Sequence, residues 1–177
     1  MKLNWINHRS KKPAKAFHWD KRVKLGSGDL CDVYKCIYGE TKKNVAIKIV
    51  RHQTLSDEEK NKIASAYTFA QELKHENINA VIGLTILDAN EALVMELADQ
   101  GNLKDFKFKD EKQKIKAALD IIAALRFLHE EKGTFHRNLK PTNILFRTGA
   151  SGEVVAQIGD AGFGKVFSKK NIIFFLI

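Results

Sequence analysis

The hydrophobic pattern of this chain changes its period once, and the change limits the folds available to it. Residues 19–50 contain polar–apolar alternation and a compact β-branched run, the pattern of half-buried strands. Residues 111–133 instead repeat apolar side chains at spacings of three and four, the pattern of an amphipathic helix. A strand-rich part followed by a helical part predicts an α+β protein in two lobes, joined near residues 96–101.

The first lobe is predicted to be an antiparallel meander with one main helix. A turn begins at residues 39–40, with residues 41–44 at its tip, and leads into a β-branched run at Val45–Val50. Residues 55–77 have a helical pattern with acidic residues in the first turn, where the helix dipole favours them. Residues 79–98 predict two more strands.

The second lobe is predicted to begin with a long helix over Lys112–Lys132, ended by Gly133. Its apolar positions include Ile115, Leu119 and Ile122. Short strands are expected around residues 143–146 and 154–158.

The positive charge of the chain is concentrated near its N-terminus. The net charge is +9, but residues 1–24 contain eight Lys and Arg against a single acid, so the remainder is nearly balanced. This predicts a basic arm over residues 1–16, a first lobe over 17–98 and a second over 99–177. The arm could serve nuclear import or nucleic-acid binding, or it could be a solvated leader. Nucleic-acid binding is not expected elsewhere.

Composition favours a cytoplasmic protein, with nuclear entry through the basic arm as the alternative. Cys31 and Cys36 are too few for a disulfide framework, which fits a reducing compartment. No stretch reaches the roughly 18 apolar residues of a membrane helix, and the N-terminus lacks the apolar core of a signal peptide. The apolar residues 172–177 are too few to span a bilayer.

The stretch "LGSGDLCDV" carries two closely spaced glycines, Gly26 and Gly28. A dinucleotide-binding fingerprint requires a helix to begin here, whereas the sequence predicts a strand. Glycine-rich hairpins between strands can cover a nucleotide, because backbone amides approach phosphate where no Cβ intervenes. An ordinary hairpin turn is the alternative.

Three further motifs follow in order: "VAIK" ending at Lys48, "HRNLKPTN" from His136 to Asn143, and "IGDAGFGK" around Asp160. With the glycine hairpin before them, they resemble the motif series of the eukaryotic protein kinases, over about residues 19–167. The resemblance implies a β-rich N-lobe with one main helix, an incomplete helical C-lobe, and ATP between the lobes.

The resemblance also implies roles for individual residues. Lys48 would contact the α- and β-phosphates of ATP, and Asn143 and Asp160 would each hold Mg²⁺ through oxygen atoms. Lys140, two residues after Asn138, matches the Ser/Thr and tyrosine-kinase-like groups. The adenine contacts implied are Val33 and Ala46 above the ring, Leu145 below it, Met95 as gatekeeper, and Glu96, Leu97 and Ala98 as hinge.

The sequence departs from the kinase pattern at several positions. Asn138 stands where the family has its catalytic Asp, and a carboxamide is not a base. Ala66 falls at the position of the helix Glu that pairs with the motif lysine. Ala161 replaces the Phe of Asp-Phe-Gly, although Phe163 follows. The sequence also ends at Ile177, before the family's activation segment and remaining helices, which predicts a fragment with apolar surface open to a protein partner.

Together these features predict a protein-kinase-like domain that binds ATP, with Ser/Thr phosphotransfer weak or lost. Two alternatives stay open. One is an active Ser/Thr-type kinase of which this sequence is a fragment. The other is a non-catalytic binding module with a vestigial nucleotide site.

Overall fold

The computed structural model describes residues 16–28, 31–39, 41–51, 56–87 and 90–163, which form two compact units. Unit 1 comprises the described residues up to Gln71 together with Val81–Leu97, and unit 2 comprises Glu72–Ala80 and the described residues from Ala98 onward. The basic stretch predicted over residues 1–16 lies almost wholly outside the described residues, as does the apolar run at 172–177.

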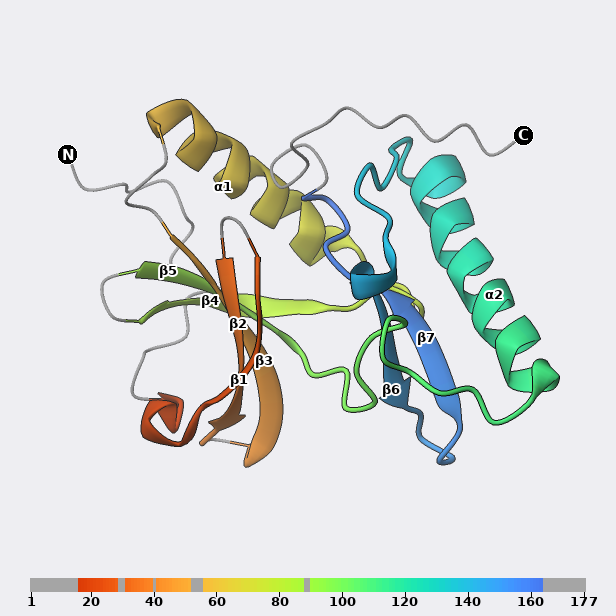
Figure 1. The fold of residues 1–177 in the computed structure, drawn as a ribbon. Helices are drawn as coiled ribbons and strands as arrows, with labels where there is room; N and C mark the ends of the chain where they lie inside the picture. Colours follow the sequence, from red (N-terminus) through yellow and green to blue (C-terminus); the bar gives the residue numbers. More distant parts are fainter. Residues whose placement is uncertain (1–15, 29–30, 40, 52–55, 88–89, 164–177) are drawn as a thin grey trace. The chain divides into compact units, whose positions relative to one another are not determined.

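Unit 1 is built on a five-stranded antiparallel sheet with strand order β1-β2-β3-β5-β4 (Figure 1). The strands are β1 (Val23–Ser27), β2 (Cys31–Tyr38), β3 (Lys43–Val50), β4 (Val81–Leu87) and β5 (Asn90–Glu96). The meander predicted from residues 19–50 is therefore correct for β1, β2 and β3, whereas β5 lies between β3 and β4. The turn between β2 and β3 is shorter than predicted, because β3 begins at Lys43 rather than at Val45.

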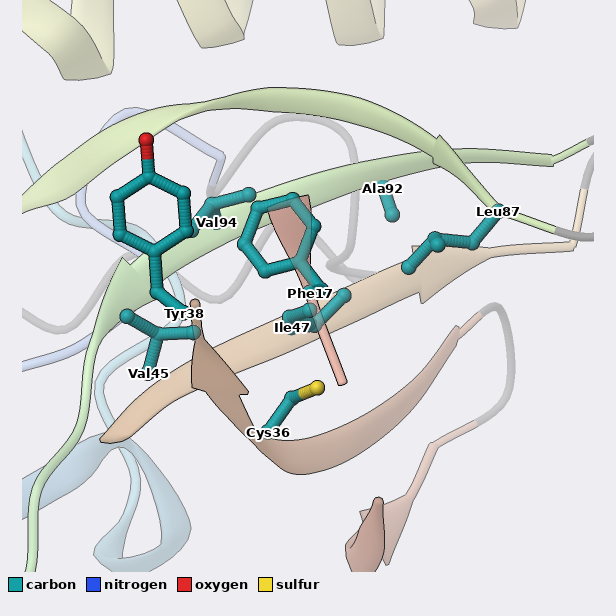
Figure 2. Packing of buried hydrophobic residues seen from close by; sticks show 8 residues of the cluster. All are labelled: Phe17, Cys36, Tyr38, Val45, Ile47, Leu87, Ala92 and Val94. Carbon is teal, nitrogen blue, oxygen red and sulfur yellow. The ribbon is translucent and has the colours of Figure 1, made fainter. Parts of the chain in front are cut away.

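One face of this sheet carries the core of unit 1 (Figure 2). Alternate residues of four neighbouring strands, β2, β3, β5 and β4, supply it, because successive side chains of a strand point to opposite faces. Phe17, which precedes β1, packs among these side chains, with its ring 5.2 Å from the ring of Tyr38. The buried members are Phe17, Cys36, Tyr38, Val45, Ile47, Leu87, Ala92 and Val94.

The helix α1 (Asp57–Glu72) buries a single face, formed by Ile63, Ala66, Tyr67 and Ala70. Their spacing of three and four residues places them on one side of an α-helix. The prediction that the helix continues to residue 77 is wrong, because α1 ends at Glu72.

The residues that follow α1 leave the helix to bond with strand β7 (Val154–Ile158) in unit 2. Asn77 accepts from the backbone N–H of Ile158 at 2.8 Å, and its side-chain amide donates to the carbonyl of Ala156 at 3.0 Å. The side chain of Gln157 in turn donates to the carbonyl of Glu76 at 2.9 Å. These bonds between residues far apart in sequence compete with helix continuation and end α1 early.

Unit 2 contains the helix α2 (Glu111–Arg126), capped by Asp110, whose carboxylate accepts from the backbone N–H of Gln113 at 2.7 Å. A π-helical turn, Phe127–Glu131, extends the helix. Gly133 then adopts φ +57°, and the N–H of Thr134 bonds back to the carbonyl of Leu128 at 2.9 Å. The helix thus ends with a left-handed glycine, as predicted.

The strands β6 (Ile144–Thr148) and β7 form an antiparallel pair against which α2 packs. Asn143, predicted as the first residue of this strand, instead closes a 3₁₀ turn, Pro141–Asn143. The ring of Phe106 stacks on that of Phe146, with centroids 3.9 Å apart, inside a small core that includes Ala117, Ile144 and Ala156.

The helix α2 buries its small residues and exposes its large ones. Ala117, Asp120 and Ala124 are buried, whereas Ile115, Leu119 and Ile122 are 61%, 57% and 58% exposed. The face turned to β7 is fixed by Asp120, whose carboxylate accepts from the backbone N–H of Ala156 at 3.1 Å. Ile115, Leu119 and Ile122 are called the α2 stripe below.

None of the helices in the described part of the chain has both the length and the apolar composition that crossing a bilayer requires.

Candidate functional site

The candidate residues from the first part of the chain share one face of the unit 1 sheet. Val33 on β2 pairs directly with Lys48 on β3, and Gly26 on β1 pairs with Val33. On the other side of β3, Ala46 pairs with Met95 on β5. Directly paired residues point to the same face, so the register brings these side chains together on the face opposite Ile47.

Burial differs along this face. Lys48 is buried, with 4% of its surface exposed, and Ala46 and Met95 are also buried. Val33 is half-buried and Gly26 is exposed. A buried lysine amid apolar side chains is uncommon, because its charge must be matched by polar or charged groups. Since Ala66 on α1 has no carboxylate, an acidic partner of Lys48 must come from another position.

The predicted hinge residues occupy the end of β5 and the segment after it. Glu96 is the last residue of the strand, and Leu97 and Ala98 follow it as half-buried, non-strand residues. Within unit 2, the next residue is fastened to β6: Asp99 accepts from the N–H of Thr148 at 2.8 Å and from its hydroxyl at 2.6 Å.

The loop before β6 carries the other candidates and is held by hydrogen bonds to its backbone. The N–H of Asn138 donates to Nδ1 of His136 at 3.3 Å, and the carbonyl of Asn138 accepts from the side-chain amide of Asn143 at 2.8 Å. The carbonyl of Asn143 accepts from the N–H of Gly159 at 2.7 Å. This chain of bonds places the Asn138 loop beside the residue that precedes Asp160.

His136 is the buried centre of this network. Its Nε2 lies 2.8 Å from the carbonyl oxygen of Gly159 and must donate to it, while Nδ1 accepts from Asn138. Both roles are filled by the neutral ring with its proton on Nε2. Burial lowers the pKa of His136, against the opposing effects of the Gly159 carbonyl and of Asp160, so the ring stays neutral at pH 7. Sequence reasoning quoted this histidine within its motif and assigned it no role.

Asp160 and Arg137 have left-handed backbone conformations, with φ of +60° and +61°. Such angles cost non-glycine residues roughly 1 kcal/mol and are common where a site requires them. Asp160 is half-buried and directly follows Gly159, where an added Cβ would lie 2.9 Å from Cδ1 of Leu145. Leu145 therefore packs closely against Gly159, the residue before the "DAG" segment.

The remaining candidates show a mixture of burial and exposure. Asn138 is half-buried, Lys140 is exposed and Asn143 is buried. Ala161 and Phe163 are both buried, with 6% and 2% of their surface exposed. Phe163 is thus a buried aromatic residue two positions after Ala161, which stands where Asp-Phe-Gly has its Phe.

A five-stranded antiparallel sheet with one helix in unit 1, and a long helix with a strand pair in unit 2, define an α+β protein. The chain belongs to the protein kinase family: residues 19–173 match the family model described as "Protein kinase domain".

Several known kinases are similar to this chain. The "Serine/threonine-protein kinase srk1" of Schizosaccharomyces pombe is 32% identical over 137 residues, which cover 70% of this chain and 24% of that protein. The "Calcium/calmodulin-dependent protein kinase type IV" of Rattus norvegicus is 28% identical over 166 residues, covering 92% of this chain and 34% of that protein. The chain thus spans about a quarter to a third of the length of these relatives.

Proposed function

We propose that this protein kinase domain binds ATP with Mg²⁺ and that its phosphoryl transfer to Ser or Thr hydroxyls is weak or lost. The observation that carries the proposal is the contrast at Asn138. Its backbone takes part in an ordered loop through His136 and Asn143, while its side chain lacks the carboxylate of a general base. Relatives named as serine/threonine kinases support the substrate class.

The proposed nucleotide contacts rest on the shared face of the unit 1 sheet. Val33, Ala46 and Met95 offer apolar surface for an adenine ring, and Lys48 offers a positive charge for phosphate. Gly26 and Gly28 allow the backbone to approach phosphate. Hydrogen bonds to the adenine edge are assigned to the backbone of Glu96, Leu97 and Ala98, and further contact with the ring to Leu145.

The residues present fit Mg²⁺ by the chemistry of their donor atoms. The side-chain nitrogen of Asn143 donates to the carbonyl of Asn138, which leaves the amide oxygen as the atom suited to a cation. The carboxylate of Asp160 supplies a second hard oxygen, as Mg²⁺ prefers. When bound, Mg²⁺ would neutralise phosphate charge.

The proposed loss of activity is chemical rather than structural. A carboxamide at position 138 can hydrogen-bond to a substrate hydroxyl but cannot accept its proton, and general-base assistance contributes roughly 10²- to 10⁴-fold. Phosphoryl transfer depends strongly on positioning and charge, so a residual rate is expected. Lys140, exposed two residues further on, is assigned to the charge on the transferring phosphoryl group.

A thermal-shift experiment on the 177-residue chain tests nucleotide binding. ATP and Mg²⁺ together should raise the midpoint of a cooperative unfolding transition, while either alone should raise it less, because a ligand stabilises the state that it binds. Lys48→Met is the matched control and should abolish the shift. A cooperative transition that no nucleotide moves would refute the proposal and favour the non-catalytic binding module.

An active Ser/Thr-type kinase remains the second candidate, because the chain spans only part of its relatives' length. It predicts measurable transfer to a Ser/Thr peptide once further kinase-domain residues are attached. In such a longer form, Asn138→Asp would then raise the rate much less than 10²-fold.

We also propose a protein partner for unit 2, namely an apolar helical segment that covers the α2 stripe. Ile115, Leu119 and Ile122 are separated by four and three residues, the spacing of a helix–helix seam. Three side chains, each 57–61% exposed, form a narrow strip of apolar surface. A typical interface needs about 800 Å² from each partner, so the stripe suits one helix better than a second folded copy.

We place the protein in the cytoplasm, with the basic arm as a route to the nucleus. Cys31 and Cys36 are free thiols, as a reducing compartment allows. Imaging of the tagged chain, with and without residues 1–16, tests both locations.

A further inference from the structure

A network of charged groups surrounds Asp32 on the hairpin of β1 and β2. The carboxylate accepts from the hydroxyl of Ser27 at 2.5 Å, and it pairs with Nζ of Lys24 at 3.1 Å and with Nη1 of Arg51 at 3.3 Å. The Ser27 hydrogen bond, followed by the Lys24 contact, lowers the pKa of Asp32. The carboxylate is therefore charged at neutral pH.

Arg51 makes a second contact that reaches the backbone of the hairpin. Its Nη2 donates to the carbonyl oxygen of Gly28, while the N–H of Gly28 donates to the carbonyl of Cys31 at 2.8 Å. Both backbone polar groups of this glycine are thus bonded. Since Arg51 directly follows β3, its guanidinium links the glycine-bearing end of the hairpin to the neighbouring strand.

The network lies on the opposite face of the sheet from the candidate nucleotide residues. Asp32 pairs with Ile49, whereas the next residue, Val33, pairs with Lys48. Because side chains alternate between faces, Asp32 points away from the face that carries Val33 and Lys48. Arg51 can therefore influence a nucleotide on that face only through the backbone that it holds.

We propose that Arg51 is a positioning residue for phosphate binding, which fixes the carbonyl of Gly28 and so holds this glycine in place before a nucleotide arrives. The inference rests on the proposed binding of ATP. Glycine loses more conformational freedom on ordering than any other residue, and that loss weakens binding when it occurs with the ligand. A hairpin already held by Arg51 avoids part of this loss.

The guanidinium is suited to this role in a way that an ammonium is not. Its planar fork donates to two acceptors at once, here a carboxylate and a carbonyl, whereas the amine of a lysine acts as a compact point charge. An isolated exposed ion pair contributes little to stability. Asp32, however, is bound from three sides and holds Arg51 beside Gly28, so the hydrogen bond to the carbonyl is supported by a network.

The test uses the 177-residue chain and the variants Arg51→Gln, Arg51→Lys and Asp32→Asn. Without nucleotide, we expect the amide of Gly28 to exchange with solvent about tenfold faster in Arg51→Gln than in the unaltered chain. Arg51→Lys should also accelerate this exchange, because an ammonium lacks the rigid planar fork that reaches the Asp32 carboxylate and the Gly28 carbonyl in one geometry. Arg126→Gln, which breaks an exposed Arg–Glu130 pair within unit 2, is the matched control and should leave Gly28 unchanged.

The second measurement compares the dissociation constants of Mg²⁺–ATP and of adenosine. Arg51→Gln and Asp32→Asn should weaken ATP binding about fivefold, while adenosine, which lacks phosphates, should change less than twofold. A merely structural role would weaken both ligands alike. A larger loss of affinity for ATP than for adenosine therefore assigns Arg51 to the positioning of the phosphate-binding hairpin.

Each other outcome has a definite meaning. If the amide of Gly28 exchanges at the same rate in Arg51→Gln as in the unaltered chain, Arg51 does not hold Gly28, whatever the measured affinity for ATP. If the amide of Gly28 exchanges faster in Arg51→Gln but the affinity for ATP is unaltered, Arg51 does not contribute to phosphate binding. If the unaltered chain binds neither ligand but the amide of Gly28 still exchanges faster in Arg51→Gln, the proposed ATP binding is wrong. Only the role of Arg51 in holding Gly28 is then supported.

Discussion

The two units hold their candidate residues in different ways. In unit 1, Val33, Lys48, Ala46 and Met95 are brought together by strand register, so their placement follows from the packing of the whole sheet. In unit 2, the Asn138 loop is placed by a few hydrogen bonds centred on His136. Residues placed by strand pairing should keep their positions when a single polar side chain is replaced. A loop placed by a few hydrogen bonds depends on each of those bonds.

The difference explains why the shape of the loop does not depend on the side chain at position 138. The bonds to His136 and Asn143 both run through the backbone of Asn138, so they do not require a particular side chain there. Changing Asp to Asn at this position therefore removes a proton acceptor without removing a loop contact. The predictions below test this contrast, beginning with the largest expected effect.

Asn138→Asp should raise phosphoryl transfer to a Ser/Thr peptide by roughly 10²- to 10⁴-fold, because it restores a general base. The free energy of unfolding should change by less than about 0.5 kcal/mol, since the loop contacts belong to the backbone. Radiolabel transfer from ATP and urea denaturation measure the two quantities. A large loss of stability would show that the loop depends on its side chain after all.

Ile47→Ala should destabilise unit 1 by about 2–5 kcal/mol. The side chain of Ile47 is fully buried on the core face of the sheet, and its truncation leaves a cavity. Urea denaturation with a probe in unit 1, such as Trp19 fluorescence, measures the change. Ile86→Ala on β4 is the matched control, since that side chain is 48% exposed. Equal effects of the two variants would contradict the assigned core.

His136→Phe should destabilise unit 2 by about 2 kcal/mol, because it leaves the carbonyl of Gly159 and the N–H of Asn138 without their ring partner. Amide exchange of unit 2 residues measures the loss, and unit 1 residues should keep their protection. His129→Phe, at an exposed position of the same unit, serves as control.

Acid should weaken unit 2 through the same histidine. The pKa of His136 lies below its ordinary value of about 6.5, so the unfolded chain takes up the proton first as the pH falls. Stability from the neutral ring is complete above pH 6.5 and declines as the pH falls below it. Unfolding of unit 2 measured between pH 7.5 and 5 should show this slope, and His136→Phe should remove it.

The smallest effect is expected on the α2 stripe. Leu119→Gln should change the free energy of unfolding by less than about 0.5 kcal/mol, because the side chain is mostly exposed and both residues favour helix. Urea denaturation measures this change. Leu128→Gln, at a fully buried position, should cost several times more. A large cost for Leu119→Gln would place that residue in a core.

Much of the fold follows from local sequence patterns. Alternation predicted the strand that follows the glycines, and three-to-four spacing predicted α2, because these periods reflect backbone geometry. Acidic residues in a first helical turn indicated α1. The motifs around Lys48, Asn143 and Asp160 sufficed to indicate a kinase.

The tertiary structure decided what depends on distant neighbours. The apolar pattern of α2 pointed to Ile115 and Leu119, yet the helix buries Ala117 and Asp120, because the carboxylate of Asp120 binds β7.

The same holds for the end of α1 and for the proton of His136. Asn77, 81 residues from Ile158, leaves the helix to pair with β7, and the carbonyl of Gly159 selects the tautomer of the histidine. Periodicity determines which side chains share a face. It carries no information on which backbone groups that face will meet, and those hydrogen bonds determine where an element ends and which face it buries.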